Sequence, residues 1–372
     1  MSGAGYLYGA TSVAPRTTTI LSTKSAAVSE TATIISTATW TETTYLPTPS
    51  TGQPGPWTRT TDYPLVPGAL NCVASGGFIY CVGGLNETAR QNAEVASDSI
   101  YYLNRTYYAS LSPTGVGHWM RTTDYPVGIF NQSCVASSNY IYCVGGSTSS
   151  HGSTGSIAQN IADVYYTSLS PSGIGLWKQA GPYPYLVAPH CMTDSGYIFC
   201  VSPHYNGTAY TDAADSYFAQ LSAAGVGNWT LSSQPPAYTA GCSASGGYAY
   251  CFGGGPCSPP GPCPSPSYYA PLSPDGVGVW TRTTSLPASG WANYVTGGSY
   301  VYYFTSPSPN SSPSYFLAHL SSNGIGPWTT STTPYPEVGP MSCVVYGAYL
   351  YCIGGLSPMG ADTDSVYFTQ IG

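Results

Sequence analysis

The cysteines are the residues of this sequence whose type and spacing point most clearly to chemistry. Ten of the twelve fall into five pairs with the same spacing, C-x8-C. These pairs are Cys72 and Cys81, Cys134 and Cys143, Cys191 and Cys200, Cys242 and Cys251, and Cys343 and Cys352. In an antiparallel hairpin with a two-residue turn, residues nine apart lie opposite each other, close enough for a disulfide. We therefore predict one disulfide across each of five hairpins.

The turns implied by this register fall mostly on residues that tolerate positive φ. They are Gly76-Gly77, Ser138-Asn139, Ser195-Gly196, Gly246-Gly247 and Gly347-Ala348. A sixth hairpin has Tyr294 and Tyr303 in the cysteine positions, which predicts an aromatic cross-strand pair. Cys257 and Cys263 lie in a proline-rich insertion, and we predict that they bond to each other.

Other kinds of site find less support in the sequence. Zinc sites favour C-x2–4-C pairs, and the five histidines stand at unrelated repeat positions, so no metal or cofactor is predicted. Asp212 with Asp215, or Asp362 with Asp364, could hold calcium, which oxygen-rich loops do only occasionally. Aspartates that precede predicted strands indicate strand capping, and these are Asp98, Asp163, Asp215 and Asp364. No paired carboxylates or other catalytic constellation emerges, so we predict that the protein is not an enzyme.

Six copies of one pattern follow one another along the chain. Each copy opens with a tryptophan, and these are Trp57, Trp119, Trp177, Trp229, Trp280 and Trp328. The spacing between them falls from 62 to 48 residues, close to the period of about 40–50 residues for propeller blades. Each copy holds four short strands with turn signals between them. The last copy lacks its own fourth strand, and the strand starting at Trp57 is predicted to supply it and close a ring.

The strand that carries the second cysteine of four hairpins ends in a double glycine. The four segments are Tyr80–Gly84, Tyr142–Gly146, Tyr250–Gly254 and Tyr351–Gly355. They resemble the kelch repeat, although the third and fifth copies lack the glycine pair. The resemblance covers about residues 57–372 and implies an all-β, six-bladed β-propeller of four-stranded kelch-like blades. The resemblance also implies that the protein is an interaction scaffold, because kelch propellers have that role more often than they are enzymes.

Composition limits the partners and the location of the protein. Charged residues make up 6% of the chain, and the eight Lys and Arg leave no basic stripe for nucleic acid. The sequence has no run of about 18 apolar residues, so we predict no membrane span. Disulfides need an oxidising compartment, so we predict an extracellular or cell-surface protein. The N-terminus does not read as a signal peptide, and we interpret it as a mature-chain sequence or a misassigned gene start.

Six sequons predict N-linked glycans as covalent partners. Their asparagines are Asn86, Asn104, Asn131, Asn206, Asn228 and Asn310. Four of them, at 86, 131, 206 and 310, fall on the rim where the longer insertions are predicted. We expect at least half of the six to be used.

Residues 1–56 precede the ring and form a Thr- and Ser-rich arm. Two segments, 17–23 and 31–43, have strand-like composition, and their apolar residues are Ile20, Leu21, Ile34, Ile35 and Trp40. Three interpretations stay open: an O-glycosylated stalk, a strand pair covering the propeller's own side, or a strand donated to a neighbouring subunit. A donated strand is a head-to-tail contact, which builds a filament when it does not close a ring.

Our leading hypothesis is therefore a glycosylated, non-enzymatic structural protein of a surface filament or lattice, a homopolymer assembled through this arm. The alternative is a monomeric cell-surface adhesin or glycan-binding propeller, and a glycan-active enzyme is the third.

Overall fold

The chain divides into two compact units, Met1–Tyr45 and Leu46–Gly372. The computed structural model describes residues 52–86, 102–152, 155–205, 210–237, 239, 241–253, 266–287, 292–305, 315–337, 342–357 and 361–372, all in the second unit. The described part contains no helix, and hence none that could cross a membrane. Of the predicted N-terminal arm, residues 1–51 lie outside the described residues, whereas residues 52–56 are described and belong to the ring, with Gly52 and Gly55 bonded to the end of blade six.

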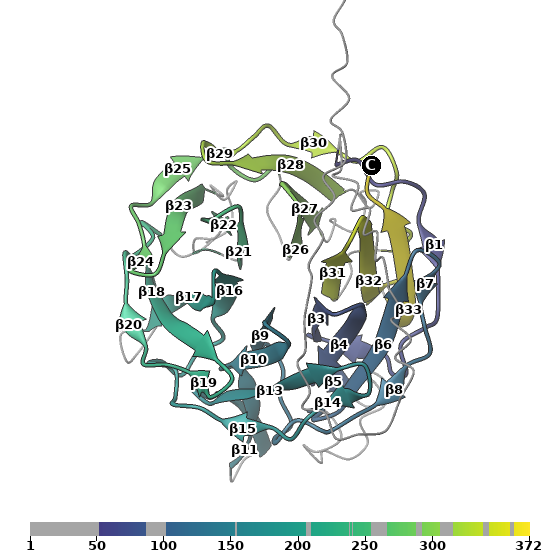
Figure 1. The fold of residues 1–372 in the computed structure, drawn as a ribbon, viewed down its shortest axis with the longest axis horizontal. Coiled ribbons are helices and arrows are strands. Elements are labelled where there is room, and N and C mark those ends of the chain that lie inside the picture. The colour runs from purple at the N-terminus through teal and green to yellow at the C-terminus, as the bar shows by residue number, and fades with distance from the viewer. Residues whose placement is uncertain are drawn as a thin grey trace, which may run out of the picture. The chain divides into compact units, whose positions relative to one another are not determined.

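The second unit is a six-bladed β-propeller whose blades follow one another around a ring (Figure 1). The inner strands, from blade one to blade six, are β3 (Asn71–Ser75), β9 (Ser133–Ser137), β16 (His190–Asp194), β21 (Gly241–Ser245), β26 (Ala292–Gly297) and β31 (Ser342–Tyr346). The second strands are β4 (Phe78–Val82), β10 (Tyr140–Val144), β17 (Tyr197–Tyr205), β22 (Tyr248–Phe252), β27 (Tyr300–Thr305) and β32 (Tyr349–Leu356).

The outer half of each blade is formed by a long third strand and a short fourth strand. The third strands are β6 (Thr106–Ser112), β13 (Val164–Ser170), β18 (Tyr210–Ser222), β23 (Ser267–Ser273), β28 (Tyr315–Ser321) and β33 (Asp362–Gln370). The outer strands are β8 (Met120–Arg121), β15 (Lys178–Gln179), β20 (Thr230–Leu231), β25 (Thr281–Thr283), β30 (Thr329–Thr330) and β1 (Thr58–Arg59). All pairings are antiparallel, which confirms the predicted six blades of four strands.

Shorter strands complete the connections. Two-residue strands turn back on the third strand in five blades, and they are β7 (Gly115–Val116), β14 (Gly173–Ile174), β19 (Gly225–Val226), β24 (Gly276–Val277) and β29 (Gly324–Ile325). Two further pairs are β2 (Pro67–Gly68) with β5 (Leu85–Asn86), and β11 (Ser147–Gly152) with β12 (Gly155–Asn160). The second pair is an insertion in blade two.

The core of the ring lies between the blades. Six clusters of buried apolar side chains each join residues of two neighbouring blades. The second strands are the most buried because they face a neighbouring blade on both sides; Ile79 and Ile141 are fully buried. A double glycine after these strands allows the next connection to approach: a Cβ on Gly83 would lie 2.6 Å from the carbonyl oxygen of Ile129.

In four of the blades a tyrosine hydroxyl bonds to the next blade around the ring. Tyr80, Tyr142, Tyr250 and Tyr351 occupy the same position of the second strand in blades one, two, four and six. Their hydroxyls donate to the carbonyls of Ser170, Ser222, Ser321 and Ser112, at the end of the next blade's third strand. Buried tyrosines require such partners, so this set of bonds fixes the spacing between blades.

Candidate functional site

The five predicted hairpin disulfides are all present, and each joins directly opposed residues of the first two strands of a blade. The Cα–Cα distances are 4.0 to 4.2 Å. The bonded pairs are Cys72 with Cys81, Cys134 with Cys143, Cys191 with Cys200, Cys242 with Cys251, and Cys343 with Cys352. Among the described residues no cysteine is free. Five intramolecular disulfides are typical of an extracellular protein.

The hairpin turns also agree with the register predicted from the cysteine spacing. Ser138 and Asn139 both have positive φ, as do Gly76 and Gly77, so these pairs form the turns. The second cysteine of each described pair, on the second strand, is fully buried. The first cysteine, on the inner strand, is slightly more exposed to solvent. The sixth predicted bond, between Cys257 and Cys263, falls outside the described residues.

Blade five has the predicted aromatic pair in place of the disulfide. Tyr294 and Tyr303 are directly opposed, and their rings stack at 5.1 Å with 12° between planes. Phe252 of blade four stacks on Tyr294 from the other side at 4.9 Å. Gly241 makes room for this arrangement, because a Cβ there would lie 2.7 Å from the Tyr294 ring. The aromatic pair therefore joins two blades, whereas a disulfide joins two strands of one blade.

The ring closes through a seam between the two ends of this unit. Strand β1 pairs with β33, opposing Thr58 to Phe368, so the chain before blade one supplies the outer strand of blade six. The contact begins before Trp57, since the amide of Gly52 donates to the Gly372 carbonyl. Pro54 also forms a bridge with Ile371.

At the seam, residues from the two ends of the ring unit come together to form a turn. In the other blades one continuous segment of chain forms this turn. In blade five the Tyr302 hydroxyl donates at 3.0 Å to the carbonyl of Gly52, where the corresponding tyrosines of other blades reach a serine carbonyl. Trp57 packs edge-to-face on Tyr335, at 4.9 Å, as Trp119 does on Tyr63 at 5.0 Å. Gly52 and Trp57 therefore occupy ordinary repeat positions, although the chain reaches them first.

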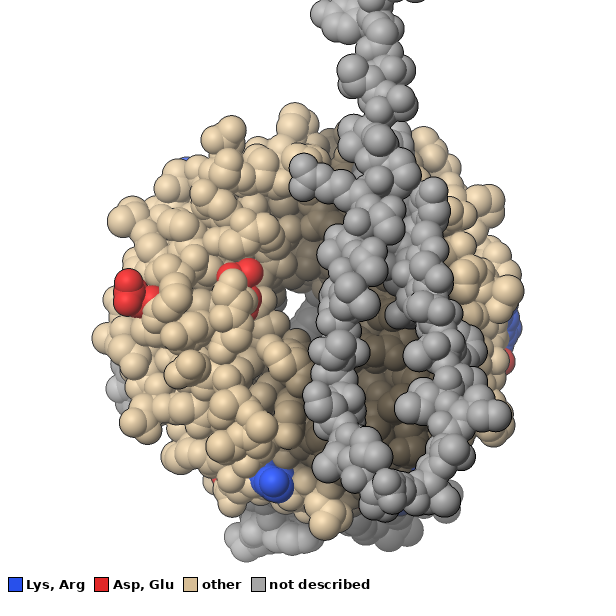
Figure 2. Space-filling model, in the orientation of Figure 1, with Lys and Arg blue, Asp and Glu red and all other residues tan. Residues whose placement is uncertain are grey.

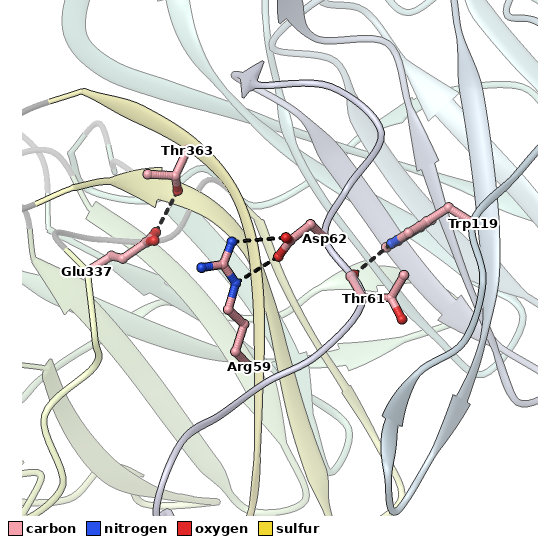
Figure 3. Close-up of polar contacts among 6 residues, drawn as sticks. All are labelled: Arg59, Thr61, Asp62, Trp119, Glu337 and Thr363. Carbon is pink, nitrogen blue, oxygen red and sulfur yellow. Dashed lines mark hydrogen bonds and ion pairs between the residues drawn. The ribbon is translucent and has the colours of Figure 1, made fainter.

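Polar contacts flank the closing strand (Figure 3). The Trp119 indole donates to the Thr61 carbonyl and links β1 to blade one. Arg59 makes a two-pronged ion pair with Asp62 that is exposed to solvent and contributes little. On blade six, the Thr363 hydroxyl donates at 2.7 Å to the buried carboxylate of Glu337.

The densest cluster of titratable side chains is in blade three. Asp215 has only 4% of its side chain exposed and contacts Nδ1 of His204 at 2.7 Å, while 37% of the His204 side chain is exposed. The side-chain amide of Gln234 donates to the other oxygen of Asp215. Burial, with hydrogen bonds to Tyr217 and Asp215, raises the pKa of Tyr185. We call Tyr185, His204, Asp215, Tyr217 and Gln234 the blade-three cluster.

Sequence reasoning missed this cluster and assigned Asp215 to strand capping or calcium. Asp215 instead lies within β18, directly opposite Ser202 of β17. Asp163 does precede its strand, β13, and accepts a hydrogen bond from Gln179. The available signal was the loss of the glycine pair in blade three, where Ser202, Pro203 and then His204 follow the buried part of the strand.

His190 is a second histidine of blade three and lies on the inner strand. It precedes Cys191 at the position held by Asn71, Ser133 and Ser342 in other blades. Those three side chains accept hydrogen bonds from backbone amides of the next inner strand, such as that of Cys191 to Ser133 at 2.9 Å. Burial lowers the pKa of His190 to about 4, so the ring is neutral at pH 7.

The other predicted sites are partly described. Asn104, Asn131 and Asn228 are exposed and Asn86 is half-buried, while Asn206 and Asn310 lie outside the described residues. The arm residues Ile20, Leu21, Ile34, Ile35 and Trp40 also lie outside them.

Arg59, Arg121 and Arg282 stand on the outer strands of blades six, one and four, so they do not meet. On the face shown in Figure 2, charged side chains are few and scattered.

Comparison with known proteins supports the fold and no more. No protein-family model and no curated protein matches the sequence. The solved structure of YjhT is similar with a TM-score of 0.56, covering 82% of this chain and 96% of that one. Sequence identity is 13%, so the likeness is one of fold. Together with the strand order it establishes a six-bladed β-propeller, and membership of the kelch family stays a prediction.

Proposed function

We propose that this protein is a non-enzymatic extracellular structural protein, a subunit that assembles into a surface filament or lattice through its N-terminal segment. The observation that carries the proposal is the closure of the ring. Because β1 supplies the last outer strand, each of the six blades has four strands without any residue before Gly52. The preceding segment, rich in Thr and Ile, is therefore not needed to complete a blade.

The ribbon of β11 and β12 in blade two is a suitable edge for an added strand. Each strand has six residues, and residues 147–160 include no Lys, Arg, Asp or Glu. Charges commonly protect edge strands from pairing, and this ribbon lacks them. In the part of the chain that the structure describes, no strand pairs with the second edge of β12. A two-stranded ribbon is marginally stable alone and gains from a third strand.

The outer strands of the blades are weaker acceptors than this ribbon. They have two or three residues each, and short edge strands are one way in which proteins avoid edge-to-edge association. We therefore place the acceptor on the ribbon of blade two. The donor is one of the uncharged, β-branched segments within residues 17–23 or 31–41 of a neighbouring copy.

Deletion of Met1–Tyr45 tests the proposal, because it removes the first unit and leaves the ring unit whole. We expect the full chain to form polymers in negative-stain electron microscopy and light scattering, and the deleted chain to be a folded monomer. Polymers of unchanged size after deletion, or a full chain that is monomeric at all concentrations, would contradict it.

Point variants locate the contact more closely. The pair Ile34→Asp and Ile35→Asp should prevent assembly, because two charges in a donated strand oppose its burial in an apolar contact. The matched pair Ser25→Asp and Ala26→Asp adds the same charge outside both segments and should leave assembly intact. On the acceptor, Ala158→Lys should weaken assembly while the monomer stays folded. Equal assembly by all three variants would refute strand donation.

We also propose that the exposed Asn104, Asn131 and Asn228 carry N-linked glycans. Their exposure makes a bulky, solubilising sugar compatible with the folded ring. Mass spectrometry of the protein secreted from a eukaryotic host, before and after enzymatic deglycosylation, should show occupancy at these three sites. Unmodified asparagine at all three would refute the proposal.

A further inference from the structure

We propose that the blade-three cluster is a binding site for a neutral carbohydrate, in which His204 forms a hydrogen bond with a sugar hydroxyl and Tyr185 provides an aromatic contact. The inference goes beyond the structural role proposed above and does not depend on it. It stands on the geometry of the cluster and on the other blades, which serve as internal controls.

Three segments of blade three depart from the repeat, and their departures meet in space. After the second strand, Ser202 and Pro203 replace the glycine pair, and the Tyr183 hydroxyl donates to Ser202 Oγ at 3.1 Å. Before the inner strand, Tyr185 stands where Leu65 and Val127 stand in blades one and two. The third departure is Gln234, which stands where Asp62 and Asp124 pair with arginines of their own loops in blades six and one.

The backbone directs His204 toward this meeting point. The pairing of β17 with β18 is regular as far as Pro203 opposite Ala214 and resumes at Tyr205 opposite Tyr210, so His204 lies in a register shift. Such bulges turn a side chain out of the regular alternation and are frequent beside active and binding sites. The His204 ring packs edge-to-face against Tyr185, with 6.2 Å between centroids.

The buried carboxylate of Asp215 sets the chemistry of the histidine. A carboxylate on Nδ1 keeps a proton on that nitrogen and fixes the orientation of the ring, so Nε2 is the nitrogen that faces away from Asp215 and can hydrogen-bond a ligand. Asp215 itself is almost fully buried and accepts from Gln234 as well, which compensates its desolvation. Burying a carboxylate with a polar partner seldom stabilises a fold more than apolar packing does, and among the described residues the other blades have no histidine–carboxylate contact. The arrangement is therefore better explained by function than by stability.

The groups of the cluster favour a neutral ligand. Sites for carboxylates or phosphates use Arg or Lys, and in the described part of the chain neither forms an ion pair with Asp215. A cationic ligand would need an accessible carboxylate, and that of Asp215 is covered. An imidazole, a phenol and the face of an aromatic ring instead match a sugar, which has hydroxyls along its edges and C–H groups on its faces.

The test measures binding of the full chain to immobilised saccharides: the neutral disaccharides cellobiose, chitobiose, maltose, mannobiose and galactobiose, and acidic and amino sugars for comparison. We expect at least one neutral saccharide to be retained. His204→Gln should weaken its binding about tenfold, the effect of losing one hydrogen bond of about 1.4 kcal/mol, and Tyr185→Leu should weaken it through loss of the aromatic contact. His204 is partly exposed, so these variants keep the fold; a thermal unfolding curve checks this.

Two control variants use the matching contact of blade two. Asp163 stands at the repeat position of Asp215 and Gln179 is its hydrogen-bond partner, so Asp163→Asn and Gln179→Ala should bind like the unaltered chain. Retention of no saccharide, retention of charged saccharides alone, or binding by His204→Gln and Tyr185→Leu equal to that of the unaltered chain would each overturn the proposal. So would equal loss in the blade-two controls, which would place the binding elsewhere on the ring.

Discussion

Blades three and five depart from the repeat in opposite directions. Blade three keeps its disulfide and gains titratable groups, with His190 on its inner strand and His204 and Asp215 on its second and third strands. Blade five has no disulfide and gains aromatic rings, with Tyr294, Tyr303 and Phe304 among them. Both fill the same four-stranded frame. The difference teaches that blade five serves stability, through contacts with its neighbours, while blade three tolerates costly groups that stability does not require.

The largest expected effect is the loss of the aromatic pair in blade five. Tyr303 is fully buried, stacks on Tyr294 and meets the Trp328 ring at 5.9 Å. Tyr303→Ala should lower the free energy of unfolding by about 3–5 kcal/mol, as truncation of a buried aromatic leaves a cavity. Urea unfolding measures this. Tyr346→Ala, at a 40% exposed position, is the control and should change it by less than about 0.5 kcal/mol.

Removal of the disulfide of blade three should have a smaller effect. The double variant Cys191→Ala and Cys200→Ala opens a short loop that the hairpin already closes, so the loss is at most about 3 kcal/mol. Unfolding in urea, with and without reductant, gives the value. A loss larger than that of Tyr303→Ala would contradict our view that the aromatic pair contributes more than a disulfide.

The third effect is a dependence of stability on pH, which we attribute to His190 of blade three. The pKa of His190 is lowered by burial to about 4, below its value of about 6.5 in an unfolded chain. Between these values the unfolded chain binds more protons, so stability is full above pH 6.5 and falls as the pH is lowered toward 4. Because the imidazole of His190 is not completely enclosed, we expect this residue to account for a loss of about 2 kcal/mol in the free energy of unfolding.

The variant His190→Ser isolates that contribution, since blade two has Ser133 at the same position and in a hydrogen bond to Cys191. Its unfolding free energy should fall less between pH 7 and pH 4.5 than that of the unaltered chain. Parallel pH profiles for the two proteins would show that His190 does not titrate in this range.

The smallest effect concerns the position at which blade three has Phe199 and blade five has Tyr302. The Tyr302 hydroxyl donates to the carbonyl of Gly52, and Phe199 has no hydroxyl to donate. Tyr302→Phe should cost about 1 kcal/mol, the net contribution of one hydrogen bond. Equal unfolding curves would mean that the seam does not depend on this bond.

The fold could be predicted from the sequence because its determinants repeat. Six tryptophans indicated the number of blades, and a constant cysteine spacing indicated the register of five inner hairpins, both of which the structure confirms. Trp57 predicted the closing strand, but the part played by Gly52 could not be found, since a backbone carbonyl leaves no pattern in sequence. The blade-three cluster escaped prediction for a related reason. Tyr185 and Gln234 lie on two separate connections and His204 on the second strand, and only the folded blade brings them to Asp215.

The seam between Gly52 and Gly372 has a mechanical consequence. Any tension that reaches the ring along the chain before Gly52 acts first on the hydrogen bonds of Gly52 with Gly372 and with the Tyr302 hydroxyl. It then acts on the bridge of Pro54 with Ile371, and only afterwards on the packing of Trp57 and on β1. The disulfides lie on the inner strands, away from this path, so a stretched ring would open at blade six while five inner hairpins stay locked.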